Sequence, residues 1–256
     1  MDRKTLSSEF MELLRLETLP VAVRLLENRD GLPKKPLPFK LNICQMISMA
    51  RHQGRTLVGV PEEMVCSIGA ACTGLIETPA AFKDGTAAVG KYVADASAGR
   101  VFFQNTFKLG DRGRLFEALL VAPLAESEGW DPQAVLFYCN PAQAMRLVHS
   151  VVYETGEKVA GDTVAEAAVC SSIGFVTDSG RPVIGLPCAG DRRFGGTQNH
   201  ELVFSAPFGM LERMIQALQE LSETSRILPI APNVMWTPRM PAAYTIGPKD
   251  LPEGGS

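Results

Sequence analysis

The residues best suited to chemistry are three cysteines in two glycine-rich segments. Cys66 and Cys72 lie in CSIGAACTG, and Cys188 lies in CAGDRRFGG. A thiolate is a soft metal ligand, and glycine lets the backbone approach a bound group closely. The pattern predicts a soft-metal or iron–sulfur site that uses these three cysteines as ligands. The alternative is that they are small buried side chains, as free cysteines often are.

The second glycine-rich segment also contains the best candidate for an anion site. Arginine carries a planar guanidinium that matches a carboxylate or phosphate, and a nearby histidine can act as acid, base or ligand. The predicted ligand-binding residues are Gly190, Arg192, Arg193, Gly195, Gly196 and His200. The alternative is a tight turn with an ion pair from Asp191 to a neighbouring arginine. No Walker, GxGxxG, HExxH or Ser-His-Asp signature occurs, so no catalytic residue is assigned.

These residue types leave three functions open, each with a small-molecule or metal partner. The first is a metal-binding or redox protein with cysteine ligands at a cleft. The second is a binding or accessory module for a small anionic metabolite, in which the cysteines are structural. The third is an enzyme with Cys188 or Cys72 as a nucleophile, activated by Arg192 or His200.

Each glycine-rich segment follows a stretch that the chain contains twice. Residues 43–61, ICQMISMARHQGRTLVGVP, align without a gap to residues 169–187, VCSSIGFVTDSGRPVIGLP, with six identities over nineteen positions. The matched cysteines Cys44 and Cys170 either form a symmetric ligand pair or occupy equivalent core positions in the two copies. Cys139 ends an apolar segment, and we expect it in the core.

The repeat predicts an α+β fold with a mixed sheet, built from two similar tandem halves related by internal duplication about a pseudo-twofold axis. We expect one domain with halves at about residues 19–125 and 131–222, and a proline-rich tail at residues 227–256. Equivalent loops of the two halves would then face one cleft, and the cysteine segments are such loops.

Local patterns predict the elements that position these loops. Apolar spacing predicts a helix at residues 43–52 that ends at Gly54, followed by a strand at residues 56–60. Alternation predicts a strand at residues 100–107, and an apolar run suggests a helix at residues 114–121.

Composition favours a globular protein without a nucleic-acid or membrane partner. The 256 residues are 46% hydrophobic and 21% charged, which is ordinary for a globular chain. The net charge of −3 and the absence of a long basic tract argue against a nucleic-acid partner. No apolar run approaches the roughly 18–20 residues of a membrane span, and the N-terminus lacks a signal-peptide pattern, so we expect a cytoplasmic protein without a membrane partner.

The segments LPVAVRLL, CQMISMAR, VCSIGAACTGLIETP and LPCAGDRRFGGTQNHELVFSAP together resemble the uncharacterised prokaryotic ArCR family, a family of unknown function. The resemblance covers about residues 19–218 and implies a shared domain, without a catalytic mechanism. The family's occurrence mainly in anaerobic bacteria and archaea favours oxygen-sensitive or metal-linked chemistry by association. The difference between CSIGAAC and CAGDRRF argues against a strictly symmetric site.

Overall fold

A computed structural model describes residues 1–30, 32, 36, 39–161 and 163–225, so the predicted tail at residues 227–256 lies outside the described part. The strands are β1 Val21–Leu26, β2 Leu57–Gly59, β3 Ala118–Pro123, β4 Ala134–Cys139, β5 Ala160–Gly161, β6 Val183–Gly185 and β7 Leu202–Pro207. The helices are α1 Arg3–Leu14, α2 Ile43–Gln53, α3 Ser67–Cys72, α4 Ala80–Lys83, α5 Ala96–Gln104, α6 Pro141–Val152, α7 Ala168–Ser179, α8 Ala189–Gly195 and α9 Leu211–Ser225.

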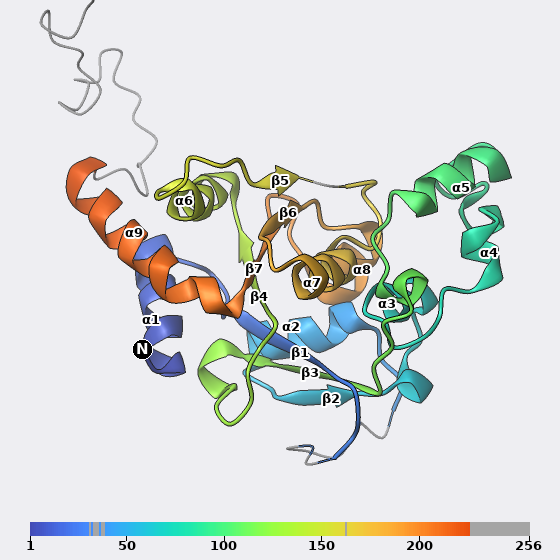
Figure 1. Cartoon of the computed structure of the whole chain (residues 1–256), viewed down its shortest axis with the longest axis horizontal. Coiled ribbons are helices and arrows are strands. Elements are labelled where there is room, and N and C mark those ends of the chain that lie inside the picture. Colours follow the sequence, from blue (N-terminus) through green and yellow to red (C-terminus); the bar gives the residue numbers. More distant parts are fainter. Residues whose placement is uncertain (31, 33–35, 37–38, 162, 226–256) are drawn as a thin grey trace, which may run out of the picture.

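The strands form one mixed sheet in the order β2-β3-β1-β4-β7-β6-β5 (Figure 1). Neighbouring strands are antiparallel except for the β5–β6 pair, which is parallel. The central pair joins β1 to β4, with Ala22 opposite Val135. The predicted α+β class with a mixed sheet is therefore confirmed.

Helices cover both faces of the sheet, as the alternation of side chains along β4 shows. Leu136 and Tyr138 pack in a cluster with α2, α3 and α7, whereas Val135 and Phe137 pack in a second cluster with α1, α6 and α9. Every residue of β4 is buried. Because successive side chains of a strand point to opposite faces, such a strand needs apolar residues at every position.

Helix α2 forms where the sequence predicts a helix. The Asn42 side chain accepts a hydrogen bond from the Gln45 N–H at 2.8 Å, and the Gln45 side chain accepts one from the Asn42 N–H at 3.0 Å. This capping box satisfies two backbone donors at the helix start. Gly54 ends the helix with a φ of +67°, in the left-handed region that glycine tolerates. The strand expected at residues 56–60 is observed as β2.

Two expected elements are wrong. Residues 100–104 belong to α5 and not to a strand, because the Asp95 carboxylate caps this helix by accepting from the Ala98 N–H at 2.9 Å. The expected helix at residues 114–121 is replaced by β3, which pairs with β1 on one side and β2 on the other. An apolar run as short as this one fits a buried strand as well as a helix, and here strand pairing determines the structure.

Helices α4 and α5 lie at the opposite end of the molecule from α1 and α9 (Figure 1). In the part of the chain that the structure describes, no helix combines the length and the apolar character needed to cross a membrane.

Candidate functional site

A cavity of about 620 Å³ lies at the first turns of α2, α3, α7 and α8. Four of the six cysteines line it, namely Cys44, Cys66, Cys170 and Cys188. We call this cavity the thiol pocket. The other two cysteines, Cys72 and Cys139, do not line it and are buried in the core clusters on opposite faces of the sheet.

Each of the four cysteines stands at the start of a helix. Cys66 and Cys188 occupy the N-cap positions of α3 and α8, while Cys44 and Cys170 lie in the first turns of α2 and α7. Backbone N–H groups without a helical partner give a helix start a partial positive charge, which favours a thiolate over a thiol. The starts of these four helices thus bring four cysteines to one pocket.

Close backbone packing brings these sulfurs near one another. A Cβ atom at Gly69 would lie 3.2 Å from Cys170 Sγ and 3.5 Å from Cys66 Sγ, so these two sulfurs are at most about 6.7 Å apart. Cys44 and Cys170 line the pocket from the first turns of α2 and α7. On the α8 side, a Cβ at Gly195 would lie 3.3 Å from the Cys44 carbonyl oxygen, so this glycine allows α8 to approach α2.

The surroundings of three pocket thiols, those of Cys66, Cys170 and Cys188, raise their pKa values and favour the protonated form near neutral pH. Burial raises the pKa of the Cys188 thiol to about 11 and also raises the pKa of Cys66. The neighbouring Cys44 thiol, together with burial, raises the pKa of the Cys170 thiol well above its usual range. A bound cation or another strong source of positive charge is therefore needed before these groups ionise.

Charged groups of both signs also line the thiol pocket. Lys40 and Arg193 contribute positive charge, and no ion pair to either is found among the described residues. Glu166 contributes a carboxylate whose Oε2 atom is buried without a hydrogen-bond partner, and burial raises the pKa of this carboxyl. The pocket therefore contains a buried acceptor that a ligand's donor group would satisfy.

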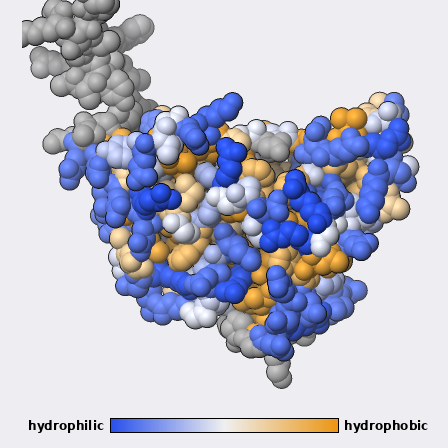
Figure 2. Space-filling model, viewed as in Figure 1, coloured by the Kyte–Doolittle hydropathy of each residue, from blue (hydrophilic) through white to orange (hydrophobic). Residues whose placement is uncertain are grey.

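Three large hydrophobic side chains that line the pocket remain well exposed. Val65, Tyr92 and Phe194 have exposed fractions of 55%, 48% and 49%. Hydrophobic residues also appear between hydrophilic ones on the surface beside α3 and α7 (Figure 2). Burial, followed by the charge of Glu166, raises the pKa of Tyr92 to about 12, so its hydroxyl remains a donor at neutral pH.

The backbone leading into α7 is strained beside the pocket. Ala165 and Ala167 have φ values of +57° and +50°, in the left-handed region that alanine rarely adopts. Such a conformation costs on the order of 1–3 kcal/mol per residue and is found preferentially at functional sites. Ala167 itself lines the pocket and precedes the first turn that carries Cys170.

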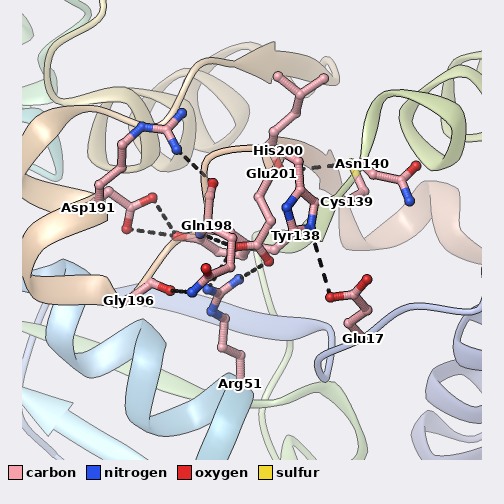
Figure 3. Close-up of polar contacts among 12 residues, drawn as sticks. Glu17, Arg51, Tyr138, Cys139, Asn140, Asp191, Gly196, Gln198, His200 and Glu201 are labelled. Carbon is pink, nitrogen blue, oxygen red and sulfur yellow. Dashed lines mark hydrogen bonds and ion pairs between the residues drawn. The ribbon is translucent and has the colours of Figure 1, made fainter.

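A buried polar network fixes α8, which carries four of the pocket residues (Figure 3). Asp191, in the first turn of α8, accepts from the Tyr138 hydroxyl at 3.0 and 3.1 Å, and burial raises the pKa of this carboxyl. Arg51 of α2 forms two hydrogen bonds with Glu201, at 2.9 and 3.1 Å, and lies 3.7 Å from the Tyr138 ring centroid. Residues from α2, β4 and the segment before β7 thus hold α8 in place.

The structure brings together only part of the predicted site. Cys66, Cys188, Gly190 and Arg193 line the thiol pocket. Cys72 is fully buried in the core at the other end of α3 and does not line the pocket. Within the described ranges, no three or more His, Cys, Asp or Glu side chains are arranged to hold a metal ion.

The other predicted ligand residues have structural contacts outside the pocket. Arg192 donates to the Gln198 carbonyl at 2.6 Å, and exposed His200 lies 4.0 Å from Glu17 (Figure 3). Gly195 packs against α2, and Gly196 caps α8 with a φ of +69°. The ion pair considered for Asp191 with a neighbouring arginine is absent from the described residues, where Tyr138 is the partner instead.

Several pocket residues were not among the predicted ligands. Cys44 and Cys170 were considered both as a ligand pair and as a repeated core position, and the repeat was the signal that marked them. No sequence motif marked the other three pocket residues, Lys40, Tyr92 and Glu166. Each lies in a loop whose path depends on the whole fold.

The chain also has recognisable relatives. It is 26% identical over 226 residues to a Methanocaldococcus jannaschii protein described as "Uncharacterized protein MJ0308". The alignment covers 85% of this chain and 94% of the relative. No solved structure gives a significant match. Residues 9–217 match the profile of domain-of-unknown-function family 169, described as "Uncharacterised ArCR". The chain therefore belongs to this family.

Proposed function

We propose that this protein binds a soft-metal centre of the iron–sulfur type in the thiol pocket, with Cys44, Cys66, Cys170 and Cys188 as ligands. The observation that carries this proposal is that four cysteines, separated by up to 144 positions in the sequence, line one cavity. Iron–sulfur clusters are commonly held by four cysteine thiolates. The ligand set replaces Cys72 of the sequence prediction by Cys44 and Cys170.

The arrangement of the sulfurs favours a group larger than one ion. A single zinc or iron ion needs its ligands within about 2.3 Å, and the described side chains contain no such convergence. The four thiols instead lie around a cavity of about 620 Å³. Cys44, Cys66, Cys170 and Cys188 would each hold a polynuclear centre from the wall of this cavity.

The charges of the pocket support the same proposal. Metal ligation requires thiolates, and four thiolates carry a large negative charge. The helix starts of α2 and α7, together with Lys40 and Arg193, would offset that charge. When bound, the centre would supply electron-transfer or Lewis-acid chemistry, while the protein residues hold it and restrict access by water.

We further propose that the pocket lies between two halves related by internal duplication. Helices α2 and α7 each carry a pocket cysteine in the first turn and end at a left-handed glycine, Gly54 or Gly180. Each is followed by a short strand and then, after a short 3-10 helix at Pro61–Glu63 in the first copy alone, by a helix with an N-cap cysteine. This shared order of elements supports a common origin of the two halves.

A second candidate is the binding of a small anionic metabolite. Lys40 and Arg193 would hold its acidic group, and the unpartnered Glu166 oxygen would accept from a donor on the same molecule. The third function, a thiol nucleophile, has less support because burial raises the pKa values of its candidate thiols, Cys72 and Cys188. A Cys66→Ser/Cys188→Ser variant that folds and still binds such an anion would favour the second candidate.

The test is anaerobic purification of the full chain, followed by reconstitution with ferrous iron and sulfide. We expect a coloured protein with broad visible absorption and about two to four iron atoms per chain, matched by acid-labile sulfide. A colourless, folded protein without bound iron, zinc or other metal by elemental analysis would exclude the proposal.

A further inference from the structure

One carboxylate oxygen in the thiol pocket lacks a partner. Glu166 lines the pocket, and its Oε2 atom is buried without a hydrogen-bond partner among the described residues. None of the ion pairs found in that part of the chain involves Glu166. A buried carboxylate without an opposite charge is costly, and a cationic group of a ligand would supply that charge.

The backbone on both sides of Glu166 holds this carboxylate at the pocket wall. Ala165 and Ala167 have φ values of +57° and +50°, a strained conformation that is found preferentially at functional sites. The Ala165 N–H donates to the Thr163 hydroxyl at 2.8 Å, and the Ala167 carbonyl accepts from the Ser171 N–H at 2.7 Å. Hydrogen bonds thus fix the segment before and after Glu166.

The two cations that line the pocket are exposed to solvent, in contrast to the Glu166 oxygen. Lys40 and Arg193 have no ion pair among the described residues. The Arg193 guanidinium lies 5.6 Å from the centroid of the Phe194 ring. An acidic group of a ligand would bind these exposed cations, while a cationic group of the same ligand would bind the buried Glu166 oxygen.

The rest of the wall suits an apolar side chain. Val65, Tyr92 and Phe194 line the pocket and are well exposed. The Tyr92 ring is stacked on Phe102, with a centroid distance of 5.3 Å and an interplanar angle of 6°, so one face of this ring is already covered. The cavity of about 620 Å³ lies within the range of roughly 300–1,000 Å³ that small-molecule sites span.

We propose that the thiol pocket binds a free amino acid with an apolar side chain. Its ammonium group would pair with Glu166, and its carboxylate would pair with Lys40 and Arg193. Its side chain would cover the exposed apolar wall. This inference rests on the second candidate function and deepens it, because it names the charged donor that accompanies the acidic group. It does not depend on a bound metal centre.

Isothermal titration calorimetry of the full-length protein, purified anaerobically, tests the proposal with matched probes. Phenylalanine carries both charged groups, 3-phenylpropionate lacks the ammonium group, phenethylamine lacks the carboxylate, and 3-phenyllactate has a hydroxyl in place of the ammonium group. We expect phenylalanine to bind roughly 10–100-fold more tightly than each analogue, because each charged group makes a charge-assisted hydrogen bond. An affinity for 3-phenyllactate equal to that for phenylalanine would overturn the proposal.

Variants assign the two ends of the ligand. Glu166→Gln removes the charge and keeps the shape, so it should weaken phenylalanine binding roughly 10–100-fold and leave 3-phenylpropionate binding unchanged. Arg193→Met should weaken both. Glu157→Gln is the matched control, because Glu157 is exposed and lines a different cavity. Unchanged phenylalanine affinity in a folded Glu166→Gln variant would overturn the proposal, and the probes on the wild-type protein decide it if the variant fails to fold.

The probes also separate this inference from the functions proposed above. If 3-phenylpropionate binds as tightly as phenylalanine, the anionic-ligand function stands and the amino-acid inference fails. If no probe binds, the amino-acid inference fails whatever the iron content. The metal proposal is decided separately, by the iron content after reconstitution.

Discussion

The buried ion pair between Arg51 and Glu201 provides the sharpest test of how the thiol pocket is held together. Both side chains are nearly inaccessible, with exposed fractions of 1% and 6%, and two hydrogen bonds of 2.9 and 3.1 Å join them. Arg51→Met removes the positive charge and leaves a buried carboxylate without its partner. Breaking a buried pair in this way costs about 3–5 kcal/mol. We therefore expect the free energy of unfolding to fall by that amount.

Urea denaturation followed by circular dichroism measures this loss as a lower midpoint at an unchanged m-value. Arg55→Met is the matched control, because Arg55 is exposed and has no ion pair among the described residues, and it should change stability by less than about 0.5 kcal/mol. Arg51→Met/Glu201→Leu removes both charges and should recover most of the loss. A loss below about 1 kcal/mol for Arg51→Met would refute the reasoning.

The pH dependence of the same variant gives an independent check. Burial would raise the pKa of Glu201, but the hydrogen bonds from Arg51 and the Gln198 N–H, with the charge of Arg51, lower it below its usual value. A lowered pKa contributes stability that is present above the unfolded-state value of about 4.3 and is lost as the pH falls through the folded value. Without Arg51, burial raises the pKa of Glu201 in the variant, so the difference between wild type and Arg51→Met should shrink steadily as the pH falls and be smallest below a pH of about 4.

Two further predictions concern the helices and the thiols. Gly174→Ala should lower the melting temperature, because a Cβ there would lie 2.4 Å from the Cys72 carbonyl oxygen and push α7 away from α3. Gly209→Ala is the control, because a Cβ at Gly209 meets open space and should leave the melting temperature unchanged. A larger effect at Gly209 would contradict this packing. Iodoacetamide should label Cys188 slowly at pH 7 and faster as the pH approaches about 11, because burial raises the pKa of this thiol to about 11. Rapid labelling at pH 7 would instead indicate an activated thiolate.

Local signals in the sequence were sufficient to predict α2. The apolar spacing and the glycine at position 54 are properties of neighbouring residues, so the helix was predicted to within one residue at its end. The same local reasoning failed for α5 and β3. The cap at Asp95 was overlooked, and the burial of β3 depends on its pairing with β1 and β2, which lie far away in the sequence.

The candidate site was predicted in part for a similar reason. Cys66 and Cys188 follow the repeated stretch, and both line the pocket. Cys72 was included because it is close to Cys66 in the sequence. Six residues of helix rise about 9 Å and turn through about 240°, so Cys72 faces the core from the far end of α3. Cys44 lines the pocket because α2, α7 and α8 pack together there. No local sequence pattern predicts that packing.

The most direct test of the central claim is the iron content of single cysteine variants after anaerobic reconstitution. Cys44→Ser, Cys66→Ser, Cys170→Ser and Cys188→Ser should each lose most of the iron and the visible absorption. Cys72→Ser and Cys139→Ser, whose sulfurs lie outside the pocket, should retain wild-type iron whenever they fold. Wild-type iron in all four pocket variants, or a loss confined to Cys72→Ser, would contradict the account.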